Sequence, residues 1–437
     1  MPAPLLALLA TLTVLLAACA SGPSTPTPSA RRPTATPPPA TSTPQVTPTP
    51  TAAPVTADRL AYVTEDGNIN LLRLSDSTDI PLTQPEAGAE AVWHAWPTWD
   101  PTGAWIAYSR YVGAGEKEDI SLLSRKVDGT ETRVLDTRPL GPNDPLVVTG
   151  APYYAQWSPT GKDLAFLAPT GRILSLGLVS NKDGAKAEEV TQGPSINMTW
   201  GRRGDTLYLS HGGVLAVVDT AFPIRPAPLG PQSTLSGIPV QSPHSYRVAY
   251  LDLSAQGHAL FVGDAAAINT GTAKVVLPVP GQAAFLWSPA REVLAVATSP
   301  DAGSFEYKAL SVVDPESGAT RQLVDETLLA FFWSPDGEKI AFVTPADERG
   351  AARLKVVPAS GGEVQTLATF RPTQDMAVYF SFFDQFAHSH SIWSADSRRL
   401  VIALEESGAP SVQVLDAQGV EPPRVVAKGY LAFWSPR

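Results

Sequence analysis

The chain of 437 residues carries 42 acidic and 32 basic side chains, for a net charge of −10 at pH 7. Every acidic residue lies beyond residue 57, so the larger part of the chain is acidic, which argues against binding to nucleic acid or to an anionic bilayer through a basic surface. Cys19 is the single cysteine, which excludes a disulfide within the chain.

Residues 1–18 have the features of an export signal. The run from Leu5 to Ala18 is apolar and uncharged, and it is too short to span a membrane comfortably. It ends in Leu16-Ala17-Ala18-Cys19, which resembles the lipobox of bacterial lipoproteins. The resemblance implies that Cys19 is acylated, becomes the first mature residue and anchors the protein outside the cytoplasm to the bacterial cell membrane. The alternative is an ordinary signal peptide followed by a chance cysteine.

Residues 20–57 form a segment of different composition. It is rich in Thr, Ser and Ala, contains eleven prolines, and has only Arg31 and Arg32 as charged side chains. Such a composition cannot bury a core and favours extended polyproline conformations. We expect a disordered stalk between the lipid anchor and a folded domain at residues 58–437.

The folded domain repeats one phrase, which stands as W-S-P-D-G-E-K-I-A-F at 333–342. Its first residue, the anchor, recurs every 41 to 60 residues, and an aliphatic residue stands seven positions after the anchor in every complete copy. The anchors are Trp99, Trp157, Trp200, Gln241, Trp287, Trp333, Trp393 and Trp434.

Each copy predicts a strand, a tight turn and a second strand, because Pro presets the backbone of the turn and Gly supplies a conformation that a side chain would block. After the copy at Trp333, two further strands are expected at Arg353–Pro358 and Val364–Ala368. Four antiparallel strands at this period are typical of a propeller blade. The sequence therefore predicts an all-β, eight-bladed β-propeller of four-stranded antiparallel blades. Because the copies at Trp200 and Gln241 depart from the pattern, seven blades are the alternative.

The last copy lacks its second strand, since only Ser435, Pro436 and Arg437 follow Trp434. The missing strand is found at the start of the domain, where 59–64 matches 339–344 position by position without a preceding anchor. We expect the carboxyl-terminal strand to be the innermost strand of a blade whose other strands come from residues 58–84. That pairing would close the ring and remove an open sheet edge.

The phrase is similar to the repeat of TolB-type, WD40-like propellers and to that of the propeller beside the hydrolase domain of dipeptidyl peptidases. The resemblance covers residues 58–437 and implies a role in protein interactions of the cell envelope. The partner-binding amino-terminal domain of the TolB family is missing, so the family's pathway does not carry over. No G-x-S-x-G nucleophile motif is present, so peptidase activity of the related kind is not expected.

Candidate binding residues precede the anchors, because blade-to-blade connections deliver them to the mouth of the central channel. They are Trp93, His94, Trp96, Tyr153, Tyr154, Asn197, Asp384, Gln385, His388, His390 and Tyr430. Two insertions, at Arg138–Pro152 and at the aromatic-rich Phe370–His390, are expected to form loops on one face. On a strand, His388 and His390 would point to the same side. The alternative interpretation is that the aromatic insertion is a small core that covers the ring.

No cofactor is expected. A metal site built from Asp384, His388 and His390 would need a further ligand, and His94 could be one if the ring brought it across. The leading hypothesis is a monomeric, lipid-anchored module that binds an envelope protein, a peptide or a glycan. The alternatives are a metal-dependent hydrolase or lyase at the channel mouth and a purely structural spacer.

Overall fold

The computed structural model describes residues 58–85, 92–114, 117–140, 153–170, 173–221, 224–230, 237–301, 304 and 306–436, which all belong to a compact unit at 53–437. Cys19, the export signal, the stalk and most of the Arg138–Pro152 insertion lie outside the described residues. No helix in the described part of the chain is both long enough and apolar enough to cross a membrane.

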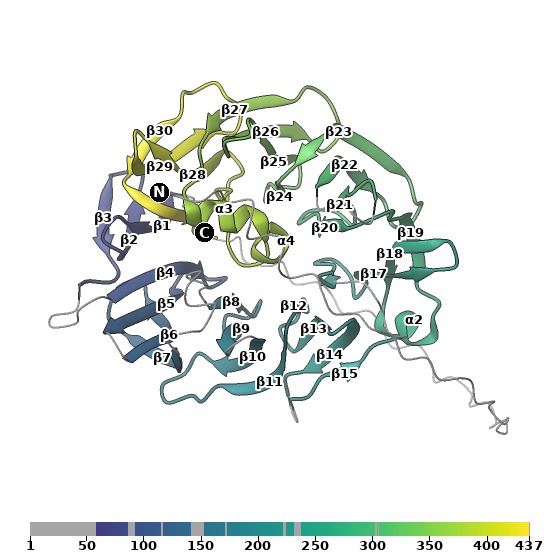
Figure 1. The fold of residues 1–437 in the computed structure, drawn as a ribbon, viewed down its shortest axis with the longest axis horizontal. Helices are drawn as coiled ribbons and strands as arrows, with labels where there is room; N and C mark the ends of the chain where they lie inside the picture. Colours follow the sequence, from purple (N-terminus) through teal and green to yellow (C-terminus); the bar gives the residue numbers. More distant parts are fainter. Residues whose placement is uncertain are drawn as a thin grey trace, which may run out of the picture. The chain divides into compact units, whose positions relative to one another are not determined.

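Eight antiparallel sheets stand side by side in a ring (Figure 1). The first blade consists of β31 (Gly429–Trp434), β1 (Arg59–Thr64), β2 (Ile69–Arg73) and β3 (Thr78–Pro81). The second consists of β4 (Val92–Trp99), β5 (Trp105–Ala114), β6 (Lys117–Lys126) and β7 (Thr132–Leu140). The third consists of β8 (Tyr154–Trp157), β9 (Asp163–Thr170), β10 (Ile173–Ser180) and β11 (Glu188–Gly193). The fourth consists of β12 (Ile196–Trp200), β13 (Thr206–His211), β14 (Val214–Asp219) and β15 (Ala227–Pro228).

The other half of the ring repeats this arrangement. The fifth blade consists of β16 (Val240–Gln241), β17 (Val248–Ser254), β18 (Gly257–Gly263) and β19 (Lys274–Pro278), with helix α2 (Ala265–Thr270) before its last strand. The sixth consists of β20 (Ala283–Trp287), β21 (Leu294–Thr298), β22 (Tyr307–Val313) and β23 (Thr320–Leu328). The seventh consists of β24 (Ala330–Trp333), β25 (Lys339–Pro345), β26 (Ala352–Pro358) and β27 (Gln365–Phe370). The eighth consists of β28 (Arg399–Glu406), β29 (Ala409–Asp416) and β30 (Arg424–Ala427), and Trp393 takes its innermost place through a single bridge to Leu400. The prediction of eight blades is confirmed, and the alternative of seven is wrong.

The two ends of the domain pair in one sheet, as predicted. Strand β31 runs antiparallel to β1, with Leu60 opposite Trp434 and Val63 opposite Leu431. This is the register of a complete copy, in which Trp333 lies opposite Ile340. In Figure 1 the yellow β31 lies beside the purple β1.

The anchor tryptophans link each blade to the one before it. The indole Nε1 of Trp157 donates to the carbonyl of Thr98 at 3.1 Å, and that of Trp393 donates to the carbonyl of Phe332 at 3.1 Å. In each case the acceptor is the residue before the preceding anchor, and the same contact is made by Trp99, Trp200, Trp287 and Trp333. Within the described residues, the buried Nε1 of Trp434 has no acceptor. The anchors therefore contribute directional bonds between blades as well as buried area.

The hydrogen bonds and backbone geometry of the turn after Trp333 explain why the phrase continues with Ser, Asp and Gly. The buried Ser334 hydroxyl donates to the Asp336 carboxylate at 2.6 Å and accepts from the Lys339 amide at 2.9 Å. Gly337 has a φ of +67°, and a Cβ atom there would lie 2.7 Å from the Ser288 hydroxyl of the preceding blade. Glycine is thus required both for the turn and for the close approach of two blades.

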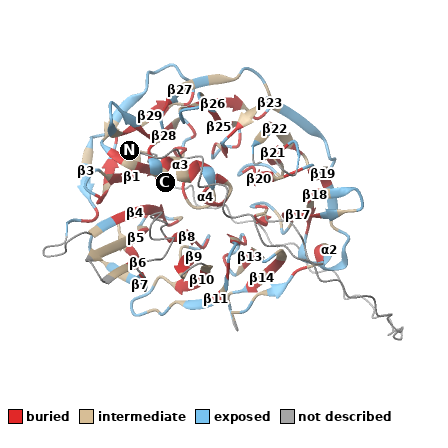
Figure 2. Cartoon of the chain, in the orientation of Figure 1, coloured by how far each residue is buried: buried red, intermediate tan, exposed pale blue. Residues whose placement is uncertain are grey.

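The centre of the ring holds two short helices, α3 (Gln374–Ser381) and α4 (Phe383–Phe386), which come from the insertion between the seventh and eighth blades (Figure 1). Figure 2 shows that buried residues line the inner strands around these helices. Tyr379, Phe383 and Phe433, which are among the largest side chains that are almost fully buried, pack there.

Candidate functional site

We call residues 371–391 the plug, because they lie at the centre of the ring against the inner strands. The Thr373 hydroxyl caps α3 by accepting from the Met376 amide at 3.2 Å, and it donates to the Tyr430 carbonyl of the first blade. Large apolar side chains at helical spacing (Met376, Tyr379, Phe380 and Phe383) then face the ring. The plug is therefore helical, whereas the sequence predicts a loop or, in the alternative, a small aromatic core without a stated secondary structure.

Besides its bond to the first blade, the plug is hydrogen-bonded to the inner strands of the second, third and fourth blades. The Gln385 side-chain amide donates to the Met198 carbonyl at 2.6 Å and accepts from the Met198 amide at 3.1 Å, as a paired strand would. Tyr154 donates its hydroxyl to the Gln385 carbonyl at 2.8 Å, and Thr98 donates to the Ser389 carbonyl at 2.9 Å. These bonds hold the plug in one position across the channel.

Aromatic rings fill the space between the plug and the blades. Phe386 stacks on Trp96 with ring centroids 4.5 Å apart, and Tyr379 stacks on Phe332 at 5.2 Å. His390 meets the ring of Phe433 edge-on at 4.6 Å. Much of the insertion therefore packs as core over the ring.

His388 and His390 do not lie on a strand, so that expectation is wrong. They follow α4 in a turn, because the helical plug replaces the innermost strand up to Trp393. Nδ1 of His390 lies 2.7 Å from the Ser389 hydroxyl. Burial lowers the pKa of His388 to about 4 and that of His390 to about 3, so both imidazoles are neutral at neutral pH.

Two carboxylates of the plug respond to burial in the opposite sense. Burial raises the pKa of Asp375 and of Asp384 to about 6. Asp384 keeps a partly exposed side chain, and its charge adds to burial in raising the pKa of Tyr307. Asp384 can therefore change its protonation state near neutral pH and act as either donor or acceptor.

The structure divides the other candidate residues among several places. Trp93 is 37% exposed at the start of β4, and its ring lies 5.9 Å from that of Tyr430. Tyr153 is buried away from the channel and donates its hydroxyl to the Asp136 carboxylate at 2.8 Å. Asn197 is half-buried on β12. Asp384, Gln385, His388 and His390 belong to the plug, and Trp96 and Tyr154 pack against it. Tyr430 borders the plug through its bond with Thr373, and Trp93 lies beside Tyr430, so we call these two residues the plug rim.

His94 is separate from the plug histidines. It is buried on β4, where its ring meets that of Tyr108 edge-on at 5.7 Å, and it lines a cavity beside the first blade. In the described part of the chain, no three His, Cys, Asp or Glu side chains lie close enough together to hold a metal ion. His94 therefore does not complete a ligand set with Asp384, His388 and His390.

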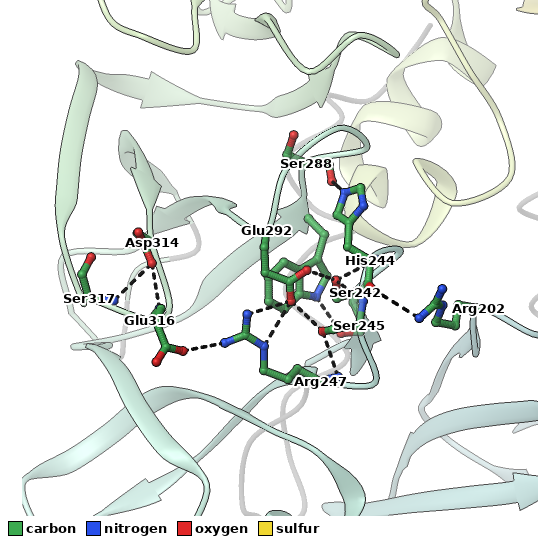
Figure 3. A network of polar contacts seen from close by, with 12 residues as sticks. Arg202, Ser242, His244, Ser245, Arg247, Ser288, Glu292, Asp314, Glu316 and Ser317 are labelled. Atoms are coloured by element: carbon green, nitrogen blue, oxygen red, sulfur yellow. Dashed lines mark hydrogen bonds and ion pairs between the residues drawn. The ribbon is translucent and has the colours of Figure 1, made fainter. Parts of the chain in front are cut away.

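A polar network that sequence reasoning missed joins the fifth and sixth blades at the turns after the anchors (Figure 3). Glu292 accepts from the hydroxyls of Ser242 at 2.7 Å and Ser245 at 2.6 Å, and Arg247 bridges it to Glu316. Burial alone would raise the pKa of Glu292, but these donors together hold it below the ordinary value. The network lies where Gln241 replaces the tryptophan anchor. That replacement was the one feature of the repeat pattern that could have indicated a polar network at this position.

No protein-family model matches the sequence, and no curated protein matches it. Solved structures do match. Dihydro-heme d1 dehydrogenase NirN in complex with DHE is 13% identical with a TM-score of 0.55, over 90% of this chain and 78% of that chain. TolB from Acinetobacter baumannii is 13% identical with a TM-score of 0.39, over 76% of this chain and 83% of that chain. An oligogalacturonate lyase in complex with manganese is 14% identical with a TM-score of 0.43, over 80% and 82%.

At these identities the likeness shows the β-propeller fold alone. One fold commonly hosts unrelated functions. The function must therefore be inferred from the site.

Proposed function

We propose that the protein is a lipid-anchored extracytoplasmic propeller that binds an envelope protein, a peptide or a glycan on the face that carries the plug. The observation that carries this proposal is the plug itself. Its aromatic side chains occupy the space between the inner strands, its backbone carbonyls are bonded to the second and third blades, and the Gln385 side chain is bonded to the fourth. The centre of the ring is thus a fixed surface of the kind that favours binding without reorganisation.

Exposed apolar side chains on this face support the proposal. Phe382, between the two plug helices, is 59% exposed, and Trp93 at the plug rim is also partly exposed. Leu329, directly before the innermost strand of the seventh blade, is exposed as well. Aromatic side chains held on rigid elements are the usual anchors of protein and glycan interfaces.

The alternative function is a metal-dependent hydrolase or lyase at the channel mouth. Asp384 is the side chain that favours it, since burial brings the pKa of its carboxyl close to the range of a general acid or base. The binding proposal is preferred because the neighbouring polar groups of the plug are used in fixed hydrogen bonds to the blades.

Membrane anchoring is tested by Cys19→Ser in the full chain. The wild-type protein is expected in the membrane fraction and to incorporate radiolabelled palmitate, whereas the variant is expected in the soluble extracytoplasmic fraction without label. A variant that stays in the membrane fraction would contradict lipid anchoring at this residue.

Binding is tested with a photo-crosslinking amino acid at Phe382, with Tyr246 as the matched control. Tyr246 is a 55% exposed aromatic residue in a turn after an anchor, at the opposite end of the strands. We expect a defined crosslinked species from position 382 and none from position 246, and digestion with protease or with glycan hydrolases separates a protein partner from a glycan. Identical products from both positions, or none from either, would contradict a binding face at the plug and favour the hypothesis of a purely structural spacer.

A further inference from the structure

A cavity of about 590 Å³ lies between the first and second blades, away from the plug. Its floor is the face of the β4–β7 sheet that looks toward the first blade, and residues 83–85, which follow β3, form its other wall. Its volume falls within the range of small-molecule binding sites.

Strand pairing arranges the lining residues in rows across the sheet. His94, Arg110 and Ser121 form one row, and Tyr108, Leu123 and Val134 form the next. Arg125 and Thr132 form a third row. Because a strand rises about 3.3 Å per residue, the backbones of Ser121 and Arg125 are roughly 13 Å apart, so the two arginines flank a central aromatic and apolar patch.

The charge of this cavity is opposite to that of the chain. Two guanidinium groups line it and no carboxylate is among the lining residues, although the net charge of the protein is −10. The Arg110 guanidinium lies 3.9 Å from the Asp119 carboxylate. Arg125 makes one long bond, of 3.4 Å, to the Gly129 carbonyl, and its Nε is buried without an acceptor among the described residues. An anion would supply the acceptor that the described residues do not offer to the Arg125 Nε.

The remaining lining groups favour a hydroxylated ligand. Tyr108, Ser121 and Thr132 bring hydroxyls, which can both donate and accept, and Tyr108 also offers an aromatic face to a sugar ring. Exposed Val134 and Thr132 on the outermost strand leave the cavity accessible from the edge of the blade.

We propose that this cavity binds a sugar acid of about monosaccharide size, with its acidic group on Arg125 and Arg110 and its hydroxyls on the neighbouring side chains. The acidic group is a carboxylate or a phosphate, which present the same acceptor oxygens to a guanidinium. The site is distinct from the plug face and does not depend on the function proposed above.

The test is isothermal titration calorimetry of the full chain at pH 7 and low salt with glucuronate, glucose 6-phosphate and neutral glucose. We expect at least one of the two acids to bind at least 10-fold more tightly than glucose. Arg125→Gln should weaken that acid about 10- to 100-fold, the usual effect of losing a hydrogen bond to a charged group. Thr132→Val, a substitution of similar shape at an exposed position, should weaken it severalfold.

Arg73→Gln is the matched control, because Arg73 is a half-exposed arginine of the first blade that pairs with Asp76 outside the cavity. It should leave the affinity for the acid unchanged. Binding of glucuronate alone assigns the site to sugar carboxylates, and binding of glucose 6-phosphate alone assigns it to sugar phosphates. Failure of both acids to bind, or equal weakening by Arg73→Gln and Arg125→Gln, would overturn the proposal.

Discussion

Gln385 is the side chain through which the plug completes the edge of an inner strand. Strand β12 pairs with β13 along one edge, and at its other edge the amide and carbonyl of Met198 are both bonded to the Gln385 side chain. Gln385 is 8% exposed, so these bonds are sheltered from water. Gln385→Leu keeps the approximate volume of the side chain and removes both partners of Met198.

The expected loss of stability follows from the two backbone groups that remain buried and unpaired. Each costs about 1–3 kcal/mol, and the added apolar surface of leucine offsets on the order of 1 kcal/mol. We therefore expect the free energy of unfolding to fall by about 1–5 kcal/mol. Gln374→Leu is the matched control, since Gln374 is the exposed first residue of α3 in the same plug, and its substitution should change the stability by no more than about 0.5 kcal/mol.

Two measurements test this prediction. Urea unfolding followed by tryptophan fluorescence gives the midpoints, and hydrogen exchange by mass spectrometry reports on the peptide that contains residues 196–200. Gln385→Leu should lower the midpoint and speed exchange in that peptide, whereas Gln374→Leu should do neither. Equal midpoints and unchanged exchange in the two variants would show that the plug does not stabilise the edge of β12.

Three further predictions concern the anchors and the titrating groups. Trp287→Phe should cost about 0.5–1.5 kcal/mol more in denaturant unfolding than Trp434→Phe, because the indole of Trp287 donates to the Val240 carbonyl at 2.9 Å whereas that of Trp434 has no acceptor among the described residues; equal losses would contradict a role for the indole bonds. The depressed pKa of Glu292 stabilises the fold above the ordinary value of 4.5 and ceases to do so as pH falls through the folded value. Glu292→Gln should therefore be less stable than wild type in thermal melts at pH 7, with the gap narrowing at pH 3 to 4; a gap independent of pH would refute this assignment. The raised pKa of Asp384, about 6, means that wild type loses stability as pH rises from 4 to 7, so Asp384→Asn should match wild type at pH 4 and melt at a higher temperature at pH 7.5; the same melting difference at both pH values would count against a buried carboxylate.

Sequence reasoning succeeded where the chain repeats itself. The copies of the phrase around Trp333 predicted the blades, the turns and the closure of the ring, because each copy states the same local preferences and the same buried positions. The predicted third and fourth strands of that copy correspond to β26 and β27. The candidate site was predicted only in part, because Trp96, Tyr154 and Gln385 come together through a segment that occurs once.

The plug shows why an unrepeated segment is harder to predict. Its aromatic composition fits a strand, a loop or a helix, and the choice depends on the Thr373 cap and on contacts with blades far away in the sequence. His388 and His390 were therefore assigned to a strand and lie in a turn instead. The cavity beside the first blade could not be predicted either. The position of His94 in the sequence does not show that its side chain will share a face of the sheet with Arg110 and Arg125.

The sequence by itself determined the propeller fold of this protein and the pairing of its two ends, and it favoured eight blades over the alternative of seven. These features depend on the residues of the local turns and on the alternation of buried positions, and both can be read directly from the repeated phrase. Only the tertiary structure decided what occupies the centre of the ring and which polar side chains face one another between blades. Those arrangements depend on distances between residues as far apart as Met198 and Gln385, which no local pattern encodes.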